Sequence, residues 1–351
     1  MSLHRYGTVI GVGRRVVASM ALVAATASTG ACGAGDGDGA SGSRDPGVPT
    51  ELVLVAASLT EPGFDAVIEG FGGSEAGADL AVTAAYGASG DQSRKVAAGL
   101  PADAVAFAAR PGMERVVRAG VVDPTWDADA THGVPAAGSV VVLVVRDGDS
   151  LGIDGWDDLL RPGVDAVVPD PRTSGAGMWS LLASYAAAGA ADGDPEAGLG
   201  FVRALVAGHV ADSPASAGAA SDAFLDGTGD VLITVESEAK RLAGEGAPVH
   251  YTVPDATMRV AYPFAVSARS GHSGAARTFM NYLYSTEGQR LWARSGFRPV
   301  DPGVAAEFVG EFPRSVGLHT IEDLGGWETV EEELFDGDDG AITRIFDEAG
   351  E

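Results

Sequence analysis

Short apolar runs alternate with segments of helical periodicity from about residue 50 onward. The runs that predict strands are Glu51–Ala57, Leu80–Ala85, Ala104–Ala108, Ser139–Val145, Ala166–Val168, Val231–Val235, Val249–Val253 and Pro263–Ala268. The helices predicted between them include Met113–Ala119, Trp156–Leu160, Leu199–Val206, Ser221–Leu225 and Gly274–Tyr284. This alternation predicts an α/β fold with mainly parallel sheets.

One turn between a strand-like run and a helix-like segment is rich in hydroxyls and glycine. Val167–Pro169 leads into Asp170–Gly177, and an apolar periodic segment then continues to about Ala188. The small side chains of residues 174 to 177 leave backbone N–H groups able to face a ligand at the positive end of the helix dipole. The ligand that suits such a helix start is an anion. One such turn taken alone, however, is more often only the capped start of an ordinary helix.

Two further predicted helix starts repeat this chemistry. Tyr86–Gln92 precedes a helical run, and Ser89 with Gln92 fits a capping box. After the first apolar run, Ser58–Pro62 places a hydroxyl near the N-cap and a proline in the first helical turn. Because ligands of open α/β sheets lie beyond the carboxyl ends of the strands, we expect the three starts to face one site.

The N-terminus reads as a targeting segment. Arg5, Arg14 and Arg15 form a basic region, and the apolar stretch Val16–Ala27 is too short to span a bilayer as a mature helix. Small residues then lead to Cys32, the only cysteine of the chain, in a pattern that resembles a lipobox. We therefore expect a signal peptide over residues 1–31 and lipidation of Cys32.

Two alternatives remain open for this segment. Thr29 stands where a lipobox usually has leucine, so a plain secretory signal with an incidental cysteine is the alternative. The paired Arg14 and Arg15 leave export by the Sec or the twin-arginine route undecided. Residues 32–49 are dominated by glycine and small polar residues and predict a flexible tether.

Composition and charge narrow the possible partners. The chain is 46% apolar, so the part beyond the tether can build a large core without disulfides. Its net charge of −26 argues against nucleic acid or an anionic lipid surface as a partner. A small anion is not excluded, because nearby dipoles in a closed cleft act more strongly than distant, screened charges.

A series of motifs follows in a characteristic order along the body. They are Tyr86-Gly87-Ala88-Ser89-Gly90-Asp91-Gln92-Ser93, Pro101-Ala102-Asp103, Trp156-Asp157-Asp158-Leu159-Leu160-Arg161-Pro162-Gly163, Pro171-Arg172-Thr173-Ser174-Gly175, Gly229-Asp230-Val231-Leu232-Ile233, Gly296-Phe297-Arg298-Pro299, Phe312-Pro313 and Thr320-Ile321-Glu322-Asp323-Leu324-Gly325-Gly326-Trp327. With these motifs the chain from about Leu52 resembles the sulfate/thiosulfate-binding proteins that deliver ligand to ABC importers.

The resemblance implies a two-lobed periplasmic-binding-protein fold of type II, with a hinge and a ligand cleft between the lobes. Lobe I is expected to comprise residues 50–138 plus 256–351, and lobe II residues 139–255. The resemblance also implies an exported, lipid-anchored monomer that binds an oxyanion and meets an ABC permease and its ATPase. No cofactor, metal or nucleic acid is expected.

The family holds its dianion without a salt bridge, through backbone N–H groups at helix starts, a serine hydroxyl and an aromatic side-chain donor. The ligand-binding positions implied for this chain are Ser58, Ser89, Gly175 and Ala176 through their backbone, Ser174 through its hydroxyl, Ala217 in the loop 212–221, and Val235.

Three of these positions depart from the family pattern. Ser58 replaces aspartate and Ala176 replaces glycine, but both keep a backbone N–H. Val235 stands where the family has tryptophan, whose indole N–H binds the ligand. Loss of that donor is expected to weaken binding by roughly 1.5–3 kcal/mol unless another donor replaces it. Thr234, Ser237 and the loop 212–221 are the candidates for that replacement.

Two other ligand or function classes are weighed against sulfate. Asp91 and Glu236 lie close to the proposed site in sequence, and a carboxylate acceptor would suit protonated phosphate. We expect instead that Asp91 occupies a first helical turn and that Glu236 points outward or braces its loop. Molybdate and tungstate also remain open as ligands.

Catalysis is the remote alternative. The six histidines show no metal-binding spacing, and the chain carries neither a G-x-S-x-G motif, nor a Walker A loop, nor a dinucleotide fingerprint. We therefore expect a binding protein and not an enzyme.

Overall fold

The structure is a computed structural model, and it describes residues 49–128, 135–337 and 339–350. The predicted signal peptide, Cys32 and almost the whole predicted tether lie outside the described residues. Within the described ranges, no helix combines the length and the apolar character that crossing a membrane requires.

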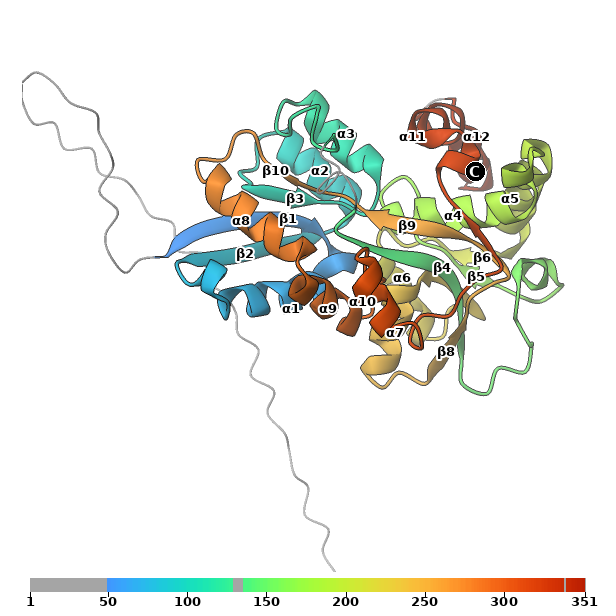
Figure 1. The fold of residues 1–351 in the computed structure, drawn as a ribbon. Helices are drawn as coiled ribbons and strands as arrows, with labels where there is room; N and C mark the ends of the chain where they lie inside the picture. Colours follow the sequence, from blue (N-terminus) through green and yellow to red (C-terminus); the bar gives the residue numbers. More distant parts are fainter. Residues whose placement is uncertain (1–48, 129–134, 338, 351) are drawn as a thin grey trace, which may run out of the picture. The chain divides into compact units, whose positions relative to one another are not determined.

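The first sheet has the strand order β10-β3-β1-β2 (Figure 1). Its strands are β1 (Thr50–Ala57), β2 (Leu80–Gly87), β3 (Ala104–Ala106) and β10 (Phe264–Val266). Strands β1, β2 and β3 run parallel, and β10 pairs antiparallel with β3. The helices of this region are α1 (Glu61–Gly72), α2 (Ser89–Ala97), α3 (Arg110–Arg118), α8 (Ser273–Tyr284), α9 (Thr286–Arg294) and α10 (Pro302–Glu307), with the 3₁₀ helices η1 (Ser58–Thr60) and η2 (Glu75–Gly77).

The second sheet has the order β11-β9-β4-β7-β5-β6, and β8 also pairs with β4. Its strands are β4 (Ala137–Arg146), β5 (Ala166–Val167), β6 (Val210–Asp212), β7 (Val231–Val235), β8 (Val249–Thr252), β9 (Ala256–Tyr262) and β11 (Gly317–His319). Its helices are α4 (Gly175–Ala187), α5 (Pro195–His209), α6 (Ala217–Leu225), α7 (Glu236–Gly244), α11 (Gly326–Val330) and α12 (Ala341–Gly350). The short helical segments are η3 (Trp156–Leu160), η4 (Ala190–Asp192), η5 (Glu322–Leu324) and η6 (Glu331–Phe335).

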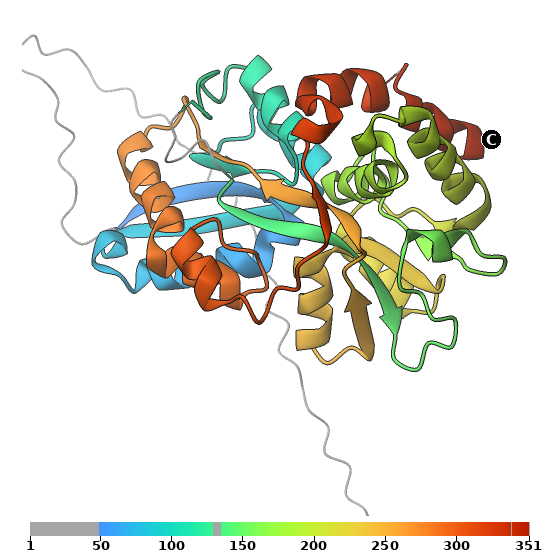
Figure 2. The same cartoon turned by 45° about the vertical axis from the view of Figure 1, so that its right-hand side comes forward.

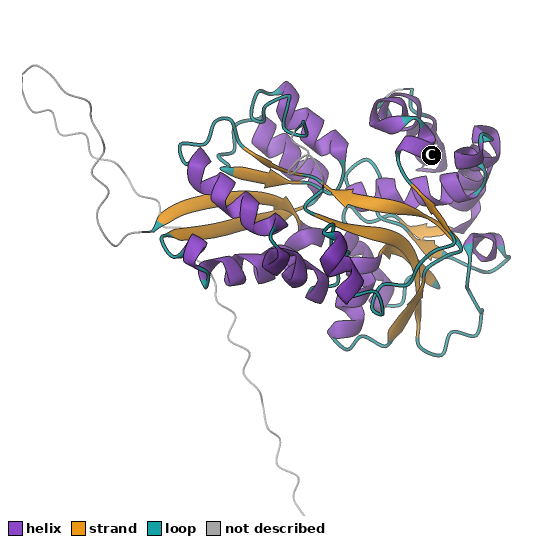
Figure 3. Ribbon diagram, viewed as in Figure 1, coloured by secondary structure: helices purple, strands orange, loops and turns teal. Residues whose placement is uncertain are grey.

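Strand β4 shows why the valine-rich runs form central strands. Helices lie on both faces of each sheet (Figure 3), so neither face of β4 meets water. Val141 and Leu143 belong to the core cluster that includes Leu181 of α4, whereas Val142 belongs to the cluster that includes Phe224 of α6. A strand buried on both faces is expected to read as a continuous apolar run. The C-terminal helix α12 packs against α5 (Figure 2).

The predicted α/β fold with mainly parallel sheets is confirmed, since parallel pairs form the centre of the first sheet and join β7, β5 and β6 in the second. Every predicted strand run overlaps an observed strand. The short strands β6 and β11 were not predicted, and neither was the longer strand β9. Its apolar residues alternate with Thr257 and Arg259, a pattern that is typical of a strand but is short.

Strand β9 also bears on the expected lobe division. That division assigned residues from 256 onward to lobe I, but β9 pairs with β4 in the second sheet. The chain returns to the first sheet at Pro263, just before β10. The segment 317–319 likewise pairs with β9 through β11. The division into lobes stays a prediction, and its second boundary is proposed again below.

Candidate functional site

The start of α4 has the structure predicted for the turn rich in hydroxyls. Ser174 is the N-cap, in an extended conformation, and its hydroxyl accepts a hydrogen bond from the Gly177 N–H at 3.4 Å. Ser174 is 4% exposed and Ala176 is fully buried. Among the described residues, no group accepts a hydrogen bond from the N–H of Gly175 or Ala176. These donors are therefore available to a ligand.

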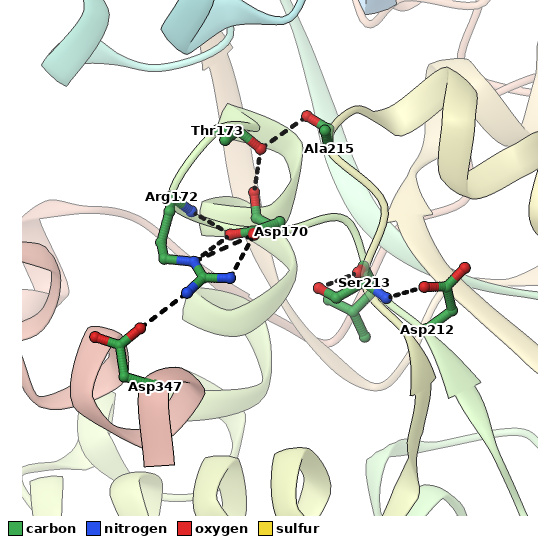
Figure 4. A network of polar contacts seen from close by, with 8 residues as sticks. Asp170, Arg172, Thr173, Asp212, Ser213, Ala215 and Asp347 are labelled. Atoms are coloured by element: carbon green, nitrogen blue, oxygen red, sulfur yellow. Dashed lines mark hydrogen bonds and ion pairs between the residues drawn. The ribbon is translucent and has the colours of Figure 1, made fainter. Parts of the chain in front are cut away.

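Main-chain hydrogen bonds tie this start to the segment that leads into α6. The Asp170 carbonyl accepts from the Ser174 N–H at 2.8 Å, and the Asp170 N–H donates to the Pro214 carbonyl at 2.8 Å. The Thr173 hydroxyl donates to the Ala215 carbonyl at 2.9 Å (Figure 4). Because each bond satisfies a backbone group, the turn before α4 and the turn before α6 are held together.

Arg172 lies on the outer side of the same turn. Its guanidinium donates to both carboxylate oxygens of Asp170 and to Asp347 of α12 at 2.8 Å (Figure 4). The hydrogen bonds that Arg172 donates to Asp170 raise the pKa of its guanidinium, and those that it donates to Asp347 add to the shift. Arg172 is exposed, so these ion pairs contribute little to stability.

The start of α6 is capped in the same way. Ser216 is the N-cap, and its hydroxyl accepts from the Ala219 N–H at 3.2 Å. Ala217 is the first residue of α6 and is 2% exposed. Helix α6 packs against η1, which begins at Ser58. Two of the implied ligand positions, Ala217 and Ser58, therefore lie on neighbouring elements.

The start of α2 corrects one prediction. The capping box of Ser89 and Gln92 is wrong, because Ala88 is the N-cap and no side chain caps this helix. The Ser89 hydroxyl instead accepts from the Ala108 N–H at 3.1 Å, and the Gln92 amide donates to the Ala85 carbonyl at 3.2 Å. Backbone groups near the ends of β2 and β3 need partners, and here they use the two side chains expected to cap α2.

The start of α2 meets the start of α4. The Gly90 N–H donates to the Thr173 carbonyl at 3.2 Å. A side chain at Gly175 would place its Cβ 2.6 Å from the Cβ of Ala108, so glycine is what permits this approach. One turn further along α4, the indole N–H of Trp179 donates to the Ala108 carbonyl at 2.8 Å.

A small cavity lies where α2 and α4 meet. Its volume is about 60 Å³, and Ser89, Ser174 and Gly175 line it. Arg115 of α3 and Arg172 also line it. Three of the implied ligand positions are thus brought together around one cavity, whereas the other four, Ser58, Ala176, Ala217 and Val235, do not line it.

Val235 ends β7 as the N-cap of α7 and is fully buried in the core. Its side chain offers no donor. Of the suggested replacements, the Ser237 hydroxyl is within hydrogen-bond distance of the Tyr262 hydroxyl at 3.3 Å. The hydroxyl of Thr234 is buried and has no hydrogen-bond partner among the described residues.

The two carboxylates considered as phosphate acceptors are both engaged. Glu236 is fully buried, which excludes the outward position but not the alternative that it braces its loop, and its oxygens lie 2.6 and 3.0 Å from Nε and Nη2 of Arg298. Burial raises the pKa of Glu236, and the charge of Arg298 opposes that shift. Asp91 occupies the first turn of α2, as expected, and is paired with Arg94 at the surface. Across the described ranges, no group of histidine and acidic residues is arranged to hold a metal ion.

Comparison with known proteins shows similarity to bacterial solute-binding proteins in both sequence and structure. The family model of bacterial extracellular solute-binding proteins matches residues 52–298. A sulfate-binding protein of Synechococcus elongatus is 32% identical over 341 residues, which cover 95% of this chain and 96% of that protein. A thiosulfate-binding protein of Pseudomonas aeruginosa is 30% identical over 281 residues, covering 78% and 84% respectively. The solved structure of the sulfate-binding protein SubI of Mycobacterium tuberculosis is 49% identical, with a TM-score of 0.80, and the match covers 82% of this chain and 100% of that one.

Proposed function

We propose that this chain, which belongs to the family of bacterial extracellular solute-binding proteins, binds sulfate outside the cytoplasm for uptake by an ABC importer. Its fold is the type II periplasmic-binding-protein fold expected from the sequence. The relatives are named for binding sulfate or thiosulfate, which supports a binding role over a catalytic one.

The observation that carries the proposal is the meeting of two helix starts that offer uncharged donors. The N–H groups of Gly175 and Ala176 are without partners in the described structure, and the hydroxyl of Ser174 lies beside them. Ser89 begins α2 on the opposite side of the same cavity. Both helix dipoles direct their positive ends to this place. Sulfate carries no proton at neutral pH, so a site composed of donors suits it.

Protonated phosphate is a poorer candidate, because it needs an acceptor as well. The carboxylate of Glu236 is occupied by Arg298, and that of Asp91 by Arg94. Thiosulfate is a plausible second ligand, since one relative is a thiosulfate-binding protein and both dianions need donors only.

We further propose that the protein closes over its ligand by a hinge. The first and second sheets would be the cores of lobes I and II, and β4 and β9 would connect them. The pairing of β9 with β4 supports a return crossing at Pro263 in place of residue 256. Closure brings donors from both lobes to one anion and expels water, which strengthens each hydrogen bond.

The remaining parts of the proposal concern export and partners. A lipid on Cys32 would hold a monomer near its permease and ATPase at the outer face of the membrane. Mass spectrometry of the N-terminal peptide tests this directly. A diacylglyceryl group on Cys32 is expected, and an unmodified cysteine or cleavage elsewhere would contradict lipid anchoring.

Titration calorimetry tests the ligand. The chain from Val48 onward, unfolded and refolded to remove bound ligand, is titrated with sulfate, thiosulfate, molybdate and phosphate. We expect tight binding of sulfate and no binding of phosphate. A folded protein that binds none of these oxyanions would contradict the proposal.

A further inference from the structure

Trp179 forms a hydrogen bond that joins the two halves of the structure. It lies in α4 beside the second sheet, and it is 1% exposed. Its indole N–H donates to the carbonyl oxygen of Ala108 at 2.8 Å. Ala108 is fully buried and follows β3 of the first sheet. A donor on the helix α4, beside the second sheet, is therefore bound to the main chain that follows β3 of the first sheet.

Ala108 is bound from both sides. Its N–H donates to the hydroxyl of Ser89 at 3.1 Å, and its carbonyl accepts from Trp179. Gly175, one helical turn before Trp179, lies so close to Ala108 that an added Cβ would fall 2.6 Å from the Ala108 Cβ. Contacts with Ala108 thus fix the distance between the start of α2 and the start of α4.

We propose that Trp179 is a positioning residue for anion binding, which sets the closed arrangement by docking α4 onto Ala108. The inference rests on the proposed function. Trp179 does not line the cavity between Ser89 and Ser174, so it acts through Ala108 and α4 and not by contact with the anion. Its N–H holds the donors of α4 opposite the start of α2.

The ring of Trp179 is itself held in place. Trp327 of α11 packs edge-on against it, with a distance of 4.9 Å between ring centroids and an interplanar angle of 76°. This packing restricts rotation of the indole and keeps its N–H directed at Ala108. The docking contact therefore includes the C-terminal part of the chain.

The energetic effect of this hydrogen bond depends on closure. When the lobes separate, the indole N–H and the Ala108 carbonyl can both bind water. In the closed arrangement, loss of the donor leaves a buried carbonyl without a partner, which is costly. Removal of the indole N–H should therefore weaken the closed, ligand-bound state more than the open one.

The substitution Trp179→Phe tests this, with Trp292→Phe as the matched control. Trp292 is also fully buried, but its indole N–H has no hydrogen-bond partner among the described residues. Both substitutions remove the same atoms from a buried site. Sulfate affinity is measured by calorimetry, dissociation by stopped-flow mixing, and thermal unfolding without ligand on the purified protein.

We expect Trp179→Phe to weaken sulfate binding about tenfold, mainly through faster dissociation, whereas Trp292→Phe leaves affinity within about twofold. Unchanged affinity and dissociation in Trp179→Phe would overturn the inference. A lower unfolding temperature without ligand, combined with unchanged dissociation, would also overturn it, because it would show a role in folding alone.

A second readout separates this inference from the proposed ligand. Wild-type protein that binds no oxyanion would contradict the proposed function, and small-angle scattering would then still test Trp179. Trp179→Phe should increase the radius of gyration of the ligand-free protein relative to Trp292→Phe. Equal values for the two variants in that case would overturn the role of Trp179 in closure.

Discussion

The starts of α2 and α4 carry the same kind of sequence, serine followed by glycine, but use it differently. At α4, Ser174 caps its own helix through the Gly177 N–H. At α2, Ser89 caps nothing and accepts a hydrogen bond from Ala108. Ser174 thus accepts a hydrogen bond from its own helix. Ser89 accepts one from the backbone of a different segment of the chain.

This difference separates two roles that a serine at a helix start can combine. Ser174 stabilises α4 and also presents a hydroxyl to the proposed anion. Ser89 connects α2 to the Ala108 segment, while its own N–H remains available to a ligand in the described structure. Substitutions at the two starts should therefore affect binding and stability in different proportions.

The largest effect on sulfate affinity is expected for the substitution Ser174→Asp. Aspartate is as good an N-cap as serine and also favours the helix dipole, so the thermal unfolding temperature should be retained. Its carboxylate, however, would occupy the anion's place and repel sulfate. We expect affinity to fall more than about 100-fold by calorimetry, in line with the cost of an unfavourable charge in a buried site.

Ser285→Asp is the matched control, because Ser285 caps α9 through the Gly288 N–H away from the cavity. It should leave sulfate affinity unchanged. Tight sulfate binding by Ser174→Asp would contradict the placement of the anion at the start of α4.

A smaller effect is expected for Gly175→Ala. The new Cβ would meet Ala108 at 2.6 Å, so α4 must move away from Ala108. Alanine favours helices over glycine, which offsets part of the cost of this shift, so stability without ligand should fall less than affinity does. We expect about a tenfold to hundredfold loss of sulfate affinity, since misplaced donors make poor hydrogen bonds. Gly274→Ala in the first turn of α8, where a Cβ has open space, is the control. Equal affinity in both variants would show that close contact between α4 and Ala108 is not needed.

At the other start, Ser89→Ala should affect stability more than binding. It leaves the buried Ala108 N–H without its acceptor, which should reduce the free energy of unfolding by about 1 kcal/mol in urea titrations. The backbone N–H of residue 89 is kept, so sulfate affinity should change by less than about threefold. A large loss of sulfate affinity with unchanged stability would contradict the view that the Ser89 side chain serves stability more than binding.

The smallest expected effect is a pH dependence of stability. It arises at the start of α7, where the carboxylate of Glu236 is buried. Burial raises the pKa of Glu236 in the folded protein above its ordinary value of 4.5. The folded state then holds a proton more readily than the unfolded state, so this group's contribution to stability falls as the pH rises from about 4.5 through the raised pKa. The unfolding temperature of the wild type minus that of Glu236→Gln should therefore decrease over this range. An increase of this difference with pH would show that the pairing with Arg298 lowers the pKa of Glu236 more than burial raises it.

The sequence predicts the positions of these elements better than the partners of their side chains. The start of α4 was predictable because Ser174 and Gly177 are neighbours along the chain. The partner of Ser89 lies 19 residues away, and Trp179 reaches Ala108 over 71 residues. No local pattern contains such pairings, because the first arises only when the first sheet and its helices assemble, and the second only when the two sheets come together.

The same reasoning explains the other differences. Strand β9 was missed because its alternation spans a few residues and gains its meaning from pairing with β4. Glu236 was expected to point outward or to brace its loop, and its buried pairing with Arg298 could not be foreseen because the two residues lie 62 positions apart. Val235 was identified as a ligand position by resemblance, and its buried side chain leaves that role untested.

An NMR titration of the nitrogen-15-labelled protein with sulfate tests most directly whether the two helix starts hold one anion together. Amide protons that donate to an anion move downfield, so the resonances of Ser89, Gly175 and Ala176 report on each donor separately. We predict that all three move downfield along one common saturation curve. Shifts confined to Gly175 and Ala176, with Ser89 unmoved at saturation, would contradict a site shared by α2 and α4.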